Sequence, residues 1–225
     1  MRLTWNYVRL YYRDMPKPSN RDKILTEGLK VVHQRGFGGA SVRDIIQAAG
    51  VPQGSFTNHF QSKEAFGLEI LDLYFVHARQ TLDQTLLNDS YSPLARLRDY
   101  IDANRTRLDN DGMENGCLFG NFLGEAVDHS EALRDRLITI FAEVSKALSY
   151  CLAAAVKAGE LPQHIDCDGV ADYIIGGLQG AILMAKVERS GVPVERFEQI
   201  LFRMVLARPD ILAPAMDLSA ATQAA

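Results

Sequence analysis

Residues 41–60, SVRDIIQAAGVPQGSFTNHF, decide the fold of the N-terminal part of this chain. Ser41 is followed three residues later by Asp44, a pattern that begins a helix by satisfying its first backbone N–H groups. This helix has about two turns before Gly50 ends it, and a second short helix is predicted from Gln53. Two short helices at this spacing predict a helix-turn-helix, which places its second helix in the major groove of DNA.

The second short helix carries two aromatic residues, one turn apart, among small polar ones. Phe56 and Phe60 are expected to anchor it to a core, so that the polar side chains between them point outward. Gln and Asn can form paired hydrogen bonds with adenine, and Ser or Thr can contact several groups. Lys63, just beyond, stands where charge and free N–H groups would hold a phosphate. The alternative is a core hairpin whose polar face is merely solvated. The predicted DNA contacts are Ser41, Arg43, Gln53, Ser55, Thr57, Asn58, His59 and Lys63.

The charge distribution fits a polyanionic partner for the N-terminal part alone. Residues 1–63 hold 10 Lys and Arg against 4 Asp and Glu, whereas residues 64–225 hold 14 against 24, within a net charge of −4. A basic segment on an acidic body is the division expected when only that segment meets nucleic acid. Chance clustering of charges on solvated faces is the alternative, so charge suggests a partner without identifying it.

Composition and cysteine usage exclude several classes of protein. At 225 residues, 47% of them apolar, the chain can form one large domain or two small ones. Its three cysteines contain no CxxC pair, so we expect no disulfide framework, no metal site and no cofactor, and a cytoplasmic location. The best candidate for a membrane span, residues 171–187, is interrupted by Asp172, Gln179 and Lys186, so no membrane span is predicted.

Helical periodicity runs through the rest of the chain, and strand-like alternation is nearly absent. The sequence therefore predicts an all-α protein of about nine helices. We expect an N-terminal three-helix helix-turn-helix DNA-binding domain over residues 19–79 and a C-terminal helical bundle over residues 80–207. Residues 1–18 are predicted to be a disordered extension, or sequence upstream of a translation start at Met15, and residues 208–225 a frayed tail.

The N-terminal part resembles the TetR family of bacterial transcriptional regulators, with the motif at about residues 42–61 and several elements in order at fixed spacing. The matching residues are Gly36-Phe37, Ser41-Val42-Arg43-Asp44-Ile45, Ala48-Ala49-Gly50-Val51, Gly54-Ser55-Phe56, His59-Phe60 and Ser62-Lys63-Glu64-Ala65. The resemblance implies a homodimeric DNA-binding regulator, most often a repressor, released from a palindromic operator by a small-molecule effector. One departure is Thr57, where the family usually has a Tyr that packs on the DNA backbone.

A second, shorter resemblance concerns the C-terminal part. Residues 115–122, NGCLFGNF, and residues 176–186 are similar to a TetR subgroup that includes sensors of reactive electrophiles and small unsaturated acids. Cys117 stands near a helix start, where free N–H groups favour the thiolate that would add to an activated alkene or aldehyde. The alternatives are a small buried hydrophobic cysteine and aromatic residues that are plain core. The predicted effector-binding residues are Cys117, Tyr74, Tyr100, Asn104, Phe119, Asn121, Phe122, Tyr150 and Gln179.

The last two predicted helices carry broad apolar faces with small residues between them, a pattern that favours a four-helix interface between two copies. A dimer also suits DNA recognition, because one short helix contacts few base pairs and a two-fold partner doubles the site. Burial within one chain would explain part or all of the same apolar stripe. The predicted interface residues are Ile174, Leu178, Ile182, Phe197 and Leu201.

Two other classes of function stay open. The histidines are scattered without an HExxH pair, and the chain has neither a GxSxG motif nor a phosphate-binding glycine loop, which disfavours an enzyme. A cysteine-dependent enzyme would require Cys117 and a distant histidine to meet. A helical protein-interaction adaptor without DNA binding is the other alternative. Binding to DNA that weakens steeply with salt would separate a regulator from both.

Overall fold

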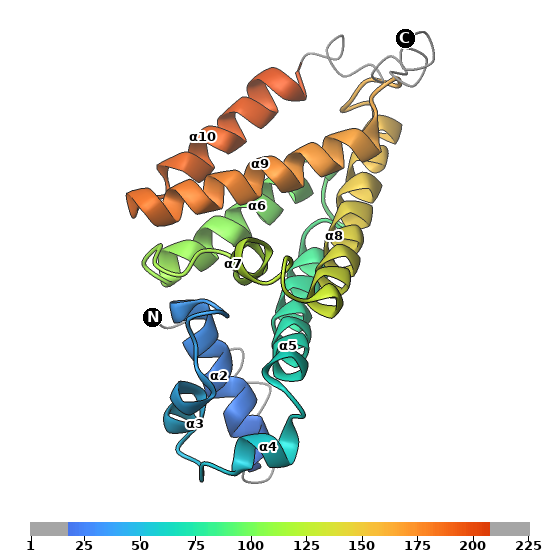
Figure 1. Cartoon of the computed structure of the whole chain (residues 1–225). Helices are drawn as coiled ribbons and strands as arrows, with labels where there is room; N and C mark the ends of the chain where they lie inside the picture. Colours follow the sequence, from blue (N-terminus) through green and yellow to red (C-terminus); the bar gives the residue numbers. More distant parts are fainter. Residues whose placement is uncertain (1–17, 208–225) are drawn as a thin grey trace, which may run out of the picture.

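The computed structural model describes residues 18–207, and every regular element within that range is helical. Figure 1 shows three N-terminal helices below a larger helical bundle, with α5 joining the two parts. The helices are α2 (Asn20–Arg35), α3 (Val42–Ala49), α4 (Ser55–His59), α5 (Lys63–Gln84), α6 (Pro93–Asn110), α7 (Leu118–Glu125), α8 (Glu131–Lys157), α9 (Cys167–Glu188) and α10 (Val192–Ile200), the last continuing into a π-helical turn at Leu201–Val205. The all-α prediction is confirmed for this part of the chain.

The N-terminal helices begin and end where the local sequence requires. Ser19 and Ser41 each accept a hydrogen bond from a backbone N–H three residues on, and Asp22 and Asp44 return one, so both pairs form capping boxes. Gly50 ends α3 in the left-handed conformation, with a φ of 60° that glycine adopts without steric cost. The predicted start and end of this helix are confirmed.

An aromatic cluster joins the three N-terminal helices to α5. Phe56 and Phe60 pack against each other and against Phe66 of α5, with ring centroids 5.2–5.4 Å apart. All three side chains are buried, together with Ile24 of α2 and Ile45 of α3. The prediction that Phe56 and Phe60 anchor α4 is therefore confirmed, and Phe66 fixes α5 to that short helix.

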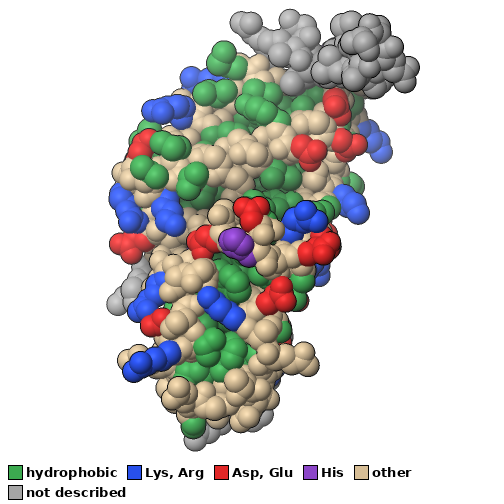
Figure 2. Space-filling model, in the orientation of Figure 1, with side chains coloured by type: hydrophobic (Ala, Val, Ile, Leu, Met, Phe, Trp, Pro, Cys, Tyr) green, Lys and Arg blue, Asp and Glu red, His purple; other side chains and the backbone are tan. Residues whose placement is uncertain are grey.

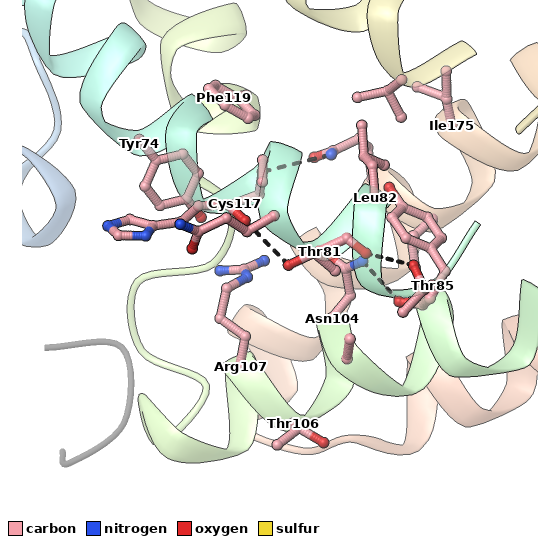
Figure 3. A pocket seen from close by; sticks show the side chains of 18 of the residues that line it. Tyr74, Thr81, Leu82, Thr85, Asn104, Thr106, Arg107, Cys117, Phe119 and Ile175 are labelled. Carbon is pink, nitrogen blue, oxygen red and sulfur yellow. Dashed lines mark hydrogen bonds between the residues drawn. The ribbon is translucent and has the colours of Figure 1, made fainter. Parts of the chain in front are cut away.

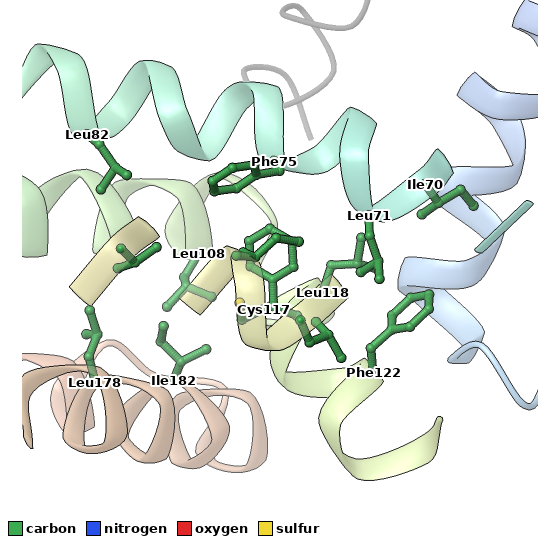
Figure 4. Close-up of a cluster of buried hydrophobic side chains, with 14 of the residues drawn as sticks. Ile70, Leu71, Phe75, Leu82, Leu108, Cys117, Leu118, Phe122, Leu178 and Ile182 are labelled. Carbon is green, nitrogen blue, oxygen red and sulfur yellow. The ribbon is translucent and has the colours of Figure 1, made fainter. Parts of the chain in front are cut away.

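Beyond this cluster, α5 enters the larger bundle and packs against α8, which also contacts α6 and α9, while α10 covers α9. Figure 4 shows the buried side chains where α5, α6, α7 and α9 meet, among them Phe75, Leu108, Leu118 and Leu178. By length and composition alone, α8 and α9 could each cross a membrane. Both contribute many buried side chains to the bundle, as the core helices of soluble proteins do.

Two predictions concern residues outside the described range. These are the disordered extension over residues 1–18, of which only Pro18 is described, and the frayed tail over residues 208–225. The expected border between residues 19–79 and residues 80–207 falls inside α5, which runs without a break through it. The domain limits therefore remain predictions.

Replacing Gly28 by alanine should destabilise the N-terminal helices. A Cβ atom at Gly28 would lie 2.4 Å from Cζ of Phe66 and 2.9 Å from Cγ2 of Ile45, and both side chains are fully buried. Because such overpacking cannot relax freely, we expect Gly28→Ala to lower the free energy of unfolding by about 1–3 kcal/mol. Urea denaturation followed by circular dichroism measures this. Gly124→Ala is the matched control, since it is helical and its Cβ would meet nothing within 4 Å. Equal stability of the two variants would contradict the packing described.

Candidate DNA-reading helix and effector pocket

The polar residues of α4 and of the turn before it lie at the lower end of the molecule in Figure 1. Gly54 has no atom within 4 Å of the place where a Cβ would stand, so the backbone there is open to close approach. Ser55 differs from our expectation, because it lies on the packed side of the short helix and is only 6% exposed. The exposed polar residues are Gln53, Thr57, Asn58 and His59.

The three other predicted DNA contacts, Ser41, Arg43 and Lys63, differ in exposure and in hydrogen-bond partners. Arg43 and Ser41 are both exposed. The hydroxyl of Ser41 donates to the carboxylate of Asp44, its partner in the α3 capping box, over 2.5 Å. Lys63 turns inward: its Nζ donates to the carbonyl of Phe37 over 2.5 Å and lies 4.7 Å from the centroid of that ring. Partial burial lowers the pKa of Lys63, although Glu125 opposes the shift. One of the three N–H donors of the ammonium group is thus taken by its own chain, and the predicted phosphate contact of Lys63 stays a prediction.

A cavity of about 400 Å³ lies inside the larger bundle, and Figure 3 shows part of its lining. Its polar groups come mainly from α5 and α6. Its apolar lining includes Phe141, Val144, Leu148, Ile174, Ile175 and Leu178. Six of the predicted effector-binding residues line it, namely Tyr74, Tyr100, Asn104, Cys117, Phe119 and Gln179. A concave, largely apolar cavity of this volume with a few polar groups is typical of small-molecule sites.

The other three predicted effector-binding residues do not line this cavity. Asn121 donates from Nδ2 to a backbone carbonyl before α7 over 3.0 Å, which holds that loop. Phe122 is fully buried on another side of α7, with its ring centroid 4.9 Å from that of Phe37. Tyr150 is 47% exposed on α8, where its hydroxyl donates to Asp89. These residues lie on helices that do line the cavity, as residue spacing predicts. Which side chain of a helix points into the cavity depends on the rotation of that helix about its axis, which the spacing does not give.

Cys117 precedes the first turn of α7 and is the one cysteine that lines the cavity. It is 7% exposed, and Gln179 donates from Nε2 to its Sγ over 3.5 Å. Cys151 donates from Sγ to the carbonyl of Pro93, and burial raises its pKa to about 11. Burial also raises the pKa of Cys167, at the start of α9. The two other thiols are therefore further from the thiolate form at neutral pH than a free cysteine would be.

His33 of α2 and Arg107 of α6 also line the cavity, and no motif in the sequence pointed to them. Both bind one carbonyl: His33 Nε2 lies 3.2 Å and Arg107 Nη1 lies 2.9 Å from the oxygen of Gly116. Burial, followed by the charge of Arg107, lowers the pKa of His33 to about 4, so the ring is neutral at pH 7 and donates through Nε2. Burial raises the pKa values of Tyr74 and Tyr100 to about 12. His33 and Gly116 are 83 positions apart in the sequence, so no local pattern could predict this contact.

Helix α7 contacts the N-terminal helices at both of its ends. Just before its first residue, Gly116 accepts the hydrogen bond from α2. At its last residue, Glu125 accepts a hydrogen bond over 3.0 Å from the backbone N–H of Gly38, in the loop between α2 and α3. Between these points Phe122 packs on Phe37. The cavity is therefore joined to the helix-turn-helix by contacts that do not run through α5.

The predicted dimer residues lie mostly inside their own chain. Ile174, Leu178, Ile182 and Leu201 are at most 3% exposed, and Phe197 is half-buried. Figure 4 shows Leu178 and Ile182 among the core side chains. Figure 2 shows apolar side chains on the upper part of the surface, where Figure 1 places α9 and α10. We define the α9–α10 face by its exposed apolar side chains, those of Leu183, Met184, Val187, Ile200 and Met204. These helices are apolar on two sides, and residue spacing alone does not tell which side is internal.

Two family models match the chain. The model of bacterial regulatory proteins of the tetR family matches residues 24–70, and that of the tetracyclin repressor-like C-terminal domain matches residues 93–201. The chain is also 36% identical over 192 residues to the HTH-type transcriptional repressor DhaR of Mycobacterium sp. (strain GP1), covering 85% of this chain and 95% of that protein. It is 30% identical over 184 residues to the HTH-type transcriptional repressor NemR of Escherichia coli K12, covering 78% and 88% respectively.

The similarity extends to solved structures. The crystal structure of regulatory protein TetR from Rhodobacter sphaeroides matches with a TM-score of 0.78 at 31% identity, over 82% of this chain and 97% of that one. The two family models together span the helix-turn-helix and most of the bundle that holds the cavity. The short helix α4 rests on an aromatic cluster, as the helix-turn-helix requires, and the family model and the relatives match along most of the chain. The chain therefore belongs to the TetR family of bacterial transcriptional regulators.

Proposed function

We propose that the protein is a homodimeric repressor that leaves its operator when a small molecule occupies the cavity. Regulators of this family bind DNA operators and small-molecule effectors and act as dimers. The observation that best supports the proposal is the exposed polar face of α4 on its buried aromatic support. Repression is inferred from the relatives DhaR and NemR, both of which are named transcriptional repressors.

In this proposal α4 enters the major groove of one half of a near-palindromic operator. Gln53 and Asn58 contact base edges, where their amides can pair with adenine. Ser55, which is 6% exposed, supports the reading helix from within the protein, and the free N–H groups of Lys63 are assigned to a phosphate. Because a threonine reaches less far than a tyrosine, position 57 makes a shorter backbone contact than is usual in the family. Phosphate contacts are assigned to Ser41, Arg43, Thr57 and His59.

The two reading helices are brought together through the α9–α10 face. Gly176 and Gly180 lie on the same side of α9 as that face, and a Cβ at either would meet nothing within 4 Å. They leave room for a partner helix to approach closely. Two helices from each copy then form a four-helix interface. Two-fold related reading helices about 34–36 Å apart would meet successive turns of the major groove.

The cavity and the reading helix are coupled mainly through α7. A ligand that displaces the peptide at Gly116 removes the hydrogen bond to His33 and shifts the contact of α7 with Gly38. Helix α5 provides a second connection, since it carries Tyr74 in the cavity wall and Phe66 under α4. Release of DNA follows from the higher affinity of the ligand for a conformer whose reading helices are wrongly spaced.

Cys117 offers a covalent route to the same change. Its thiolate adds to the β-carbon of an activated alkene: a carbon–sulfur bond forms, the π bond breaks, and a proton equivalent to the one lost by the thiol ends on the α-carbon. The adduct enlarges a side chain that is 7% exposed and directly follows Gly116. The reaction needs no oxidant, and its product occupies the cavity permanently.

We assign the protein no catalytic activity, and we place it in the cytoplasm without a membrane partner, as for a DNA-binding regulator. A cysteine-dependent enzyme would need a base beside Cys117, whereas the group that contacts its Sγ is the amide of Gln179, which cannot take up a proton. No metal or cofactor enters the proposal. Within residues 18–207, no group of three or more His, Cys, Asp or Glu side chains could hold a metal ion.

Asn58→Ala should weaken operator binding without affecting folding, because the side chain is exposed and its amide is assigned to a base edge. The operator is first selected from a random DNA pool with the purified protein, and affinity is then measured by fluorescence anisotropy. We expect a loss of about tenfold or more, while the unmodified protein binds more weakly as salt rises. Gln163→Ala, an exposed change in the larger bundle, is the control. Failure to recover any DNA from the pool, or full affinity of Asn58→Ala, would refute the assignment.

Leu183→Glu should convert the dimer into a monomer. Leu183 is 60% exposed on the α9–α10 face, so a charge there disturbs pairing and not the fold of one chain. Ile138→Glu is the matched control, since Ile138 is also 60% exposed but lies on α8. Analytical ultracentrifugation should show a monomer for Leu183→Glu only, with operator binding lost at concentrations where the control binds. A dimeric Leu183→Glu would place the interface elsewhere.

Cys117→Ser should still bind the operator but no longer respond to an electrophile. N-ethylmaleimide carries an activated double bond and is expected to release the unmodified protein from DNA, with mass spectrometry locating the adduct on Cys117. Cys167→Ser is the control and should be released like the unmodified protein, because Cys167 lies outside the cavity. Release of the Cys117→Ser variant by the same reagent would show that another group senses it.

A further inference from the structure

The two threonines of α5 that line the cavity use their hydroxyl hydrogens within their own helix. Thr81 donates from Oγ1 to the carbonyl of His77 over 3.2 Å, and Thr85 donates from Oγ1 to the carbonyl of Thr81 over 2.6 Å. Figure 3 shows both side chains along the cavity. A hydroxyl has one hydrogen and two acceptor lone pairs, so each oxygen still offers an acceptor to a ligand. Because Thr85 is only 9% exposed, a ligand that fills the cavity removes its remaining water, and a donor on the ligand would replace that water.

The charged side chains of the lining balance each other. Arg107 of α6 is positively charged, and its Nη1 donates to the carbonyl of Gly116 over 2.9 Å. The carboxylate of Asp111, four residues further on, lines the same cavity and acts on Arg107 electrostatically. Asp111 also accepts hydrogen bonds from the backbone N–H and from Nδ2 of Asn115, over 3.1 and 2.7 Å. One positive and one negative side chain in the same lining leave no charge for a ligand to neutralise.

The histidines and tyrosines of the lining are uncharged at neutral pH. Burial lowers the pKa of His33 to about 4 and also lowers the pKa of His77, so both rings are mostly neutral at pH 7. Burial raises the pKa values of Tyr74 and Tyr100 to about 12, so both phenols keep their protons. A charged ligand would leave water for a lining that offers it no free opposite charge, whereas a neutral ligand avoids that cost.

The residues that lead from solvent into the cavity are uncharged as well. Gln80 and Gln84 of α5 and Thr106 of α6 line the cavity and are exposed. The cavity therefore opens between these two helices, past amide and hydroxyl groups that neither attract nor repel a charge. This entrance suits a neutral polar molecule.

The side of the cavity formed by α8 and α9 suits a hydrocarbon body. Its side chains are mainly apolar, among them Val144, Leu148 and Ile175. The polar residue that α9 contributes is Gln179, whose Nε2 donates to Sγ of Cys117 over 3.5 Å. Hydrogen-bond acceptors on α5 and apolar side chains on α8 and α9 together match a neutral molecule with one donor end and one apolar end.

We propose that the effector is a small neutral alcohol whose hydroxyl donates to Thr81 or Thr85 and whose hydrocarbon body lies against α8 and α9. This inference rests on the proposed function, because it takes the cavity as the effector site. A hydroxyl is the smallest neutral group that supplies the required hydrogen. The specific contact is made on α5, the helix that also carries Phe66 under α4.

The test compares alcohols with ethers of the same composition, which can accept a hydrogen bond but cannot donate one. Hexan-1-ol with 1-methoxypentane, and benzyl alcohol with anisole, are titrated into the free protein and followed by isothermal calorimetry. At least one alcohol should bind about tenfold or more tightly than its ether, because the ether leaves the threonine acceptors unpaired. Equal affinities of alcohol and ether in both pairs, or no binding of either alcohol, would overturn the proposal.

The matching acids test whether the site is neutral. Hexanoate and benzoate are titrated in the same way, and each should bind more weakly than the alcohol with the same carbon skeleton. An acid that binds as tightly as its alcohol, or more tightly, would show that Arg107 is open to an anion and would contradict the balance of charge with Asp111. These comparisons use the unmodified protein, so they are decisive even if a variant fails to fold.

Variants then assign the preference to one helix. In at least one of Thr81→Val and Thr85→Val, the affinity for the alcohol should fall to that for the ether, and the affinity for the ether should stay unchanged. The corresponding change to serine keeps the hydroxyl and should retain the preference. Thr139→Val is the matched control, since Thr139 also donates to a carbonyl four residues earlier, over 3.0 Å, but is exposed on α8 outside the cavity. A preference for the alcohol that survives in both valine variants would place its hydroxyl elsewhere.

Failure of this inference and failure of the proposed function give different results. The preferred alcohol should also weaken operator binding, and an alcohol that binds without this effect would not be the effector. A protein that binds its selected operator but shows no preference for alcohols contradicts only the assignment of the ligand. A protein that prefers alcohols but recovers no DNA from the random pool contradicts only the assignment as a DNA-binding regulator.

Discussion

Helix α4 has five residues and cannot maintain its conformation through its own hydrogen bonds. Its position depends on the burial of Phe66, the α5 ring that lies under Phe56 and Phe60. The close approach of that ring to Gly28 of α2 leaves it little freedom. The exposed polar side chains of α4 are thus held in place by a residue outside the helix-turn-helix itself. Because α5 also carries Tyr74, one continuous helix extends from the reading surface to the cavity wall.

A second connection between the two parts passes through one backbone carbonyl. Gly116 accepts hydrogen bonds from His33 of the N-terminal helices and from Arg107 of the bundle, and Cys117 follows directly. A single peptide group with two donors from different parts of the chain has few ways to move without losing one of them. An adduct at the Cys117 thiol, or a ligand that displaces this peptide, would therefore disturb the same hydrogen bonds. The proposed noncovalent and covalent routes would therefore act on the same peptide group.

The sequence was most informative where structure is decided by neighbouring residues. The capping box that begins at Ser41 and the left-handed Gly50 follow from local chemistry, and the helix between them was predicted correctly. The direction of Lys63 depends on Phe37, 26 residues earlier, and no helical pattern reveals that contact. Similarly, the apolar stripe that contains Leu178 could pack inward or outward, since a helix that is apolar on two sides does not show which one a partner covers. Arg107 was missed because an arginine on an amphipathic helix is ordinarily a surface residue.

The α9–α10 face also bears on how the regulator responds to its own abundance. If two copies pair through this apolar surface, as proposed, then assembly and DNA occupancy depend on the amount of protein present. At levels below the dissociation constant of the pair, the quantity of assembled protein rises with the square of the quantity synthesised. For such a dimer, a modest change in expression would produce a larger change in operator coverage, so gene dosage would become an input alongside the chemical signal.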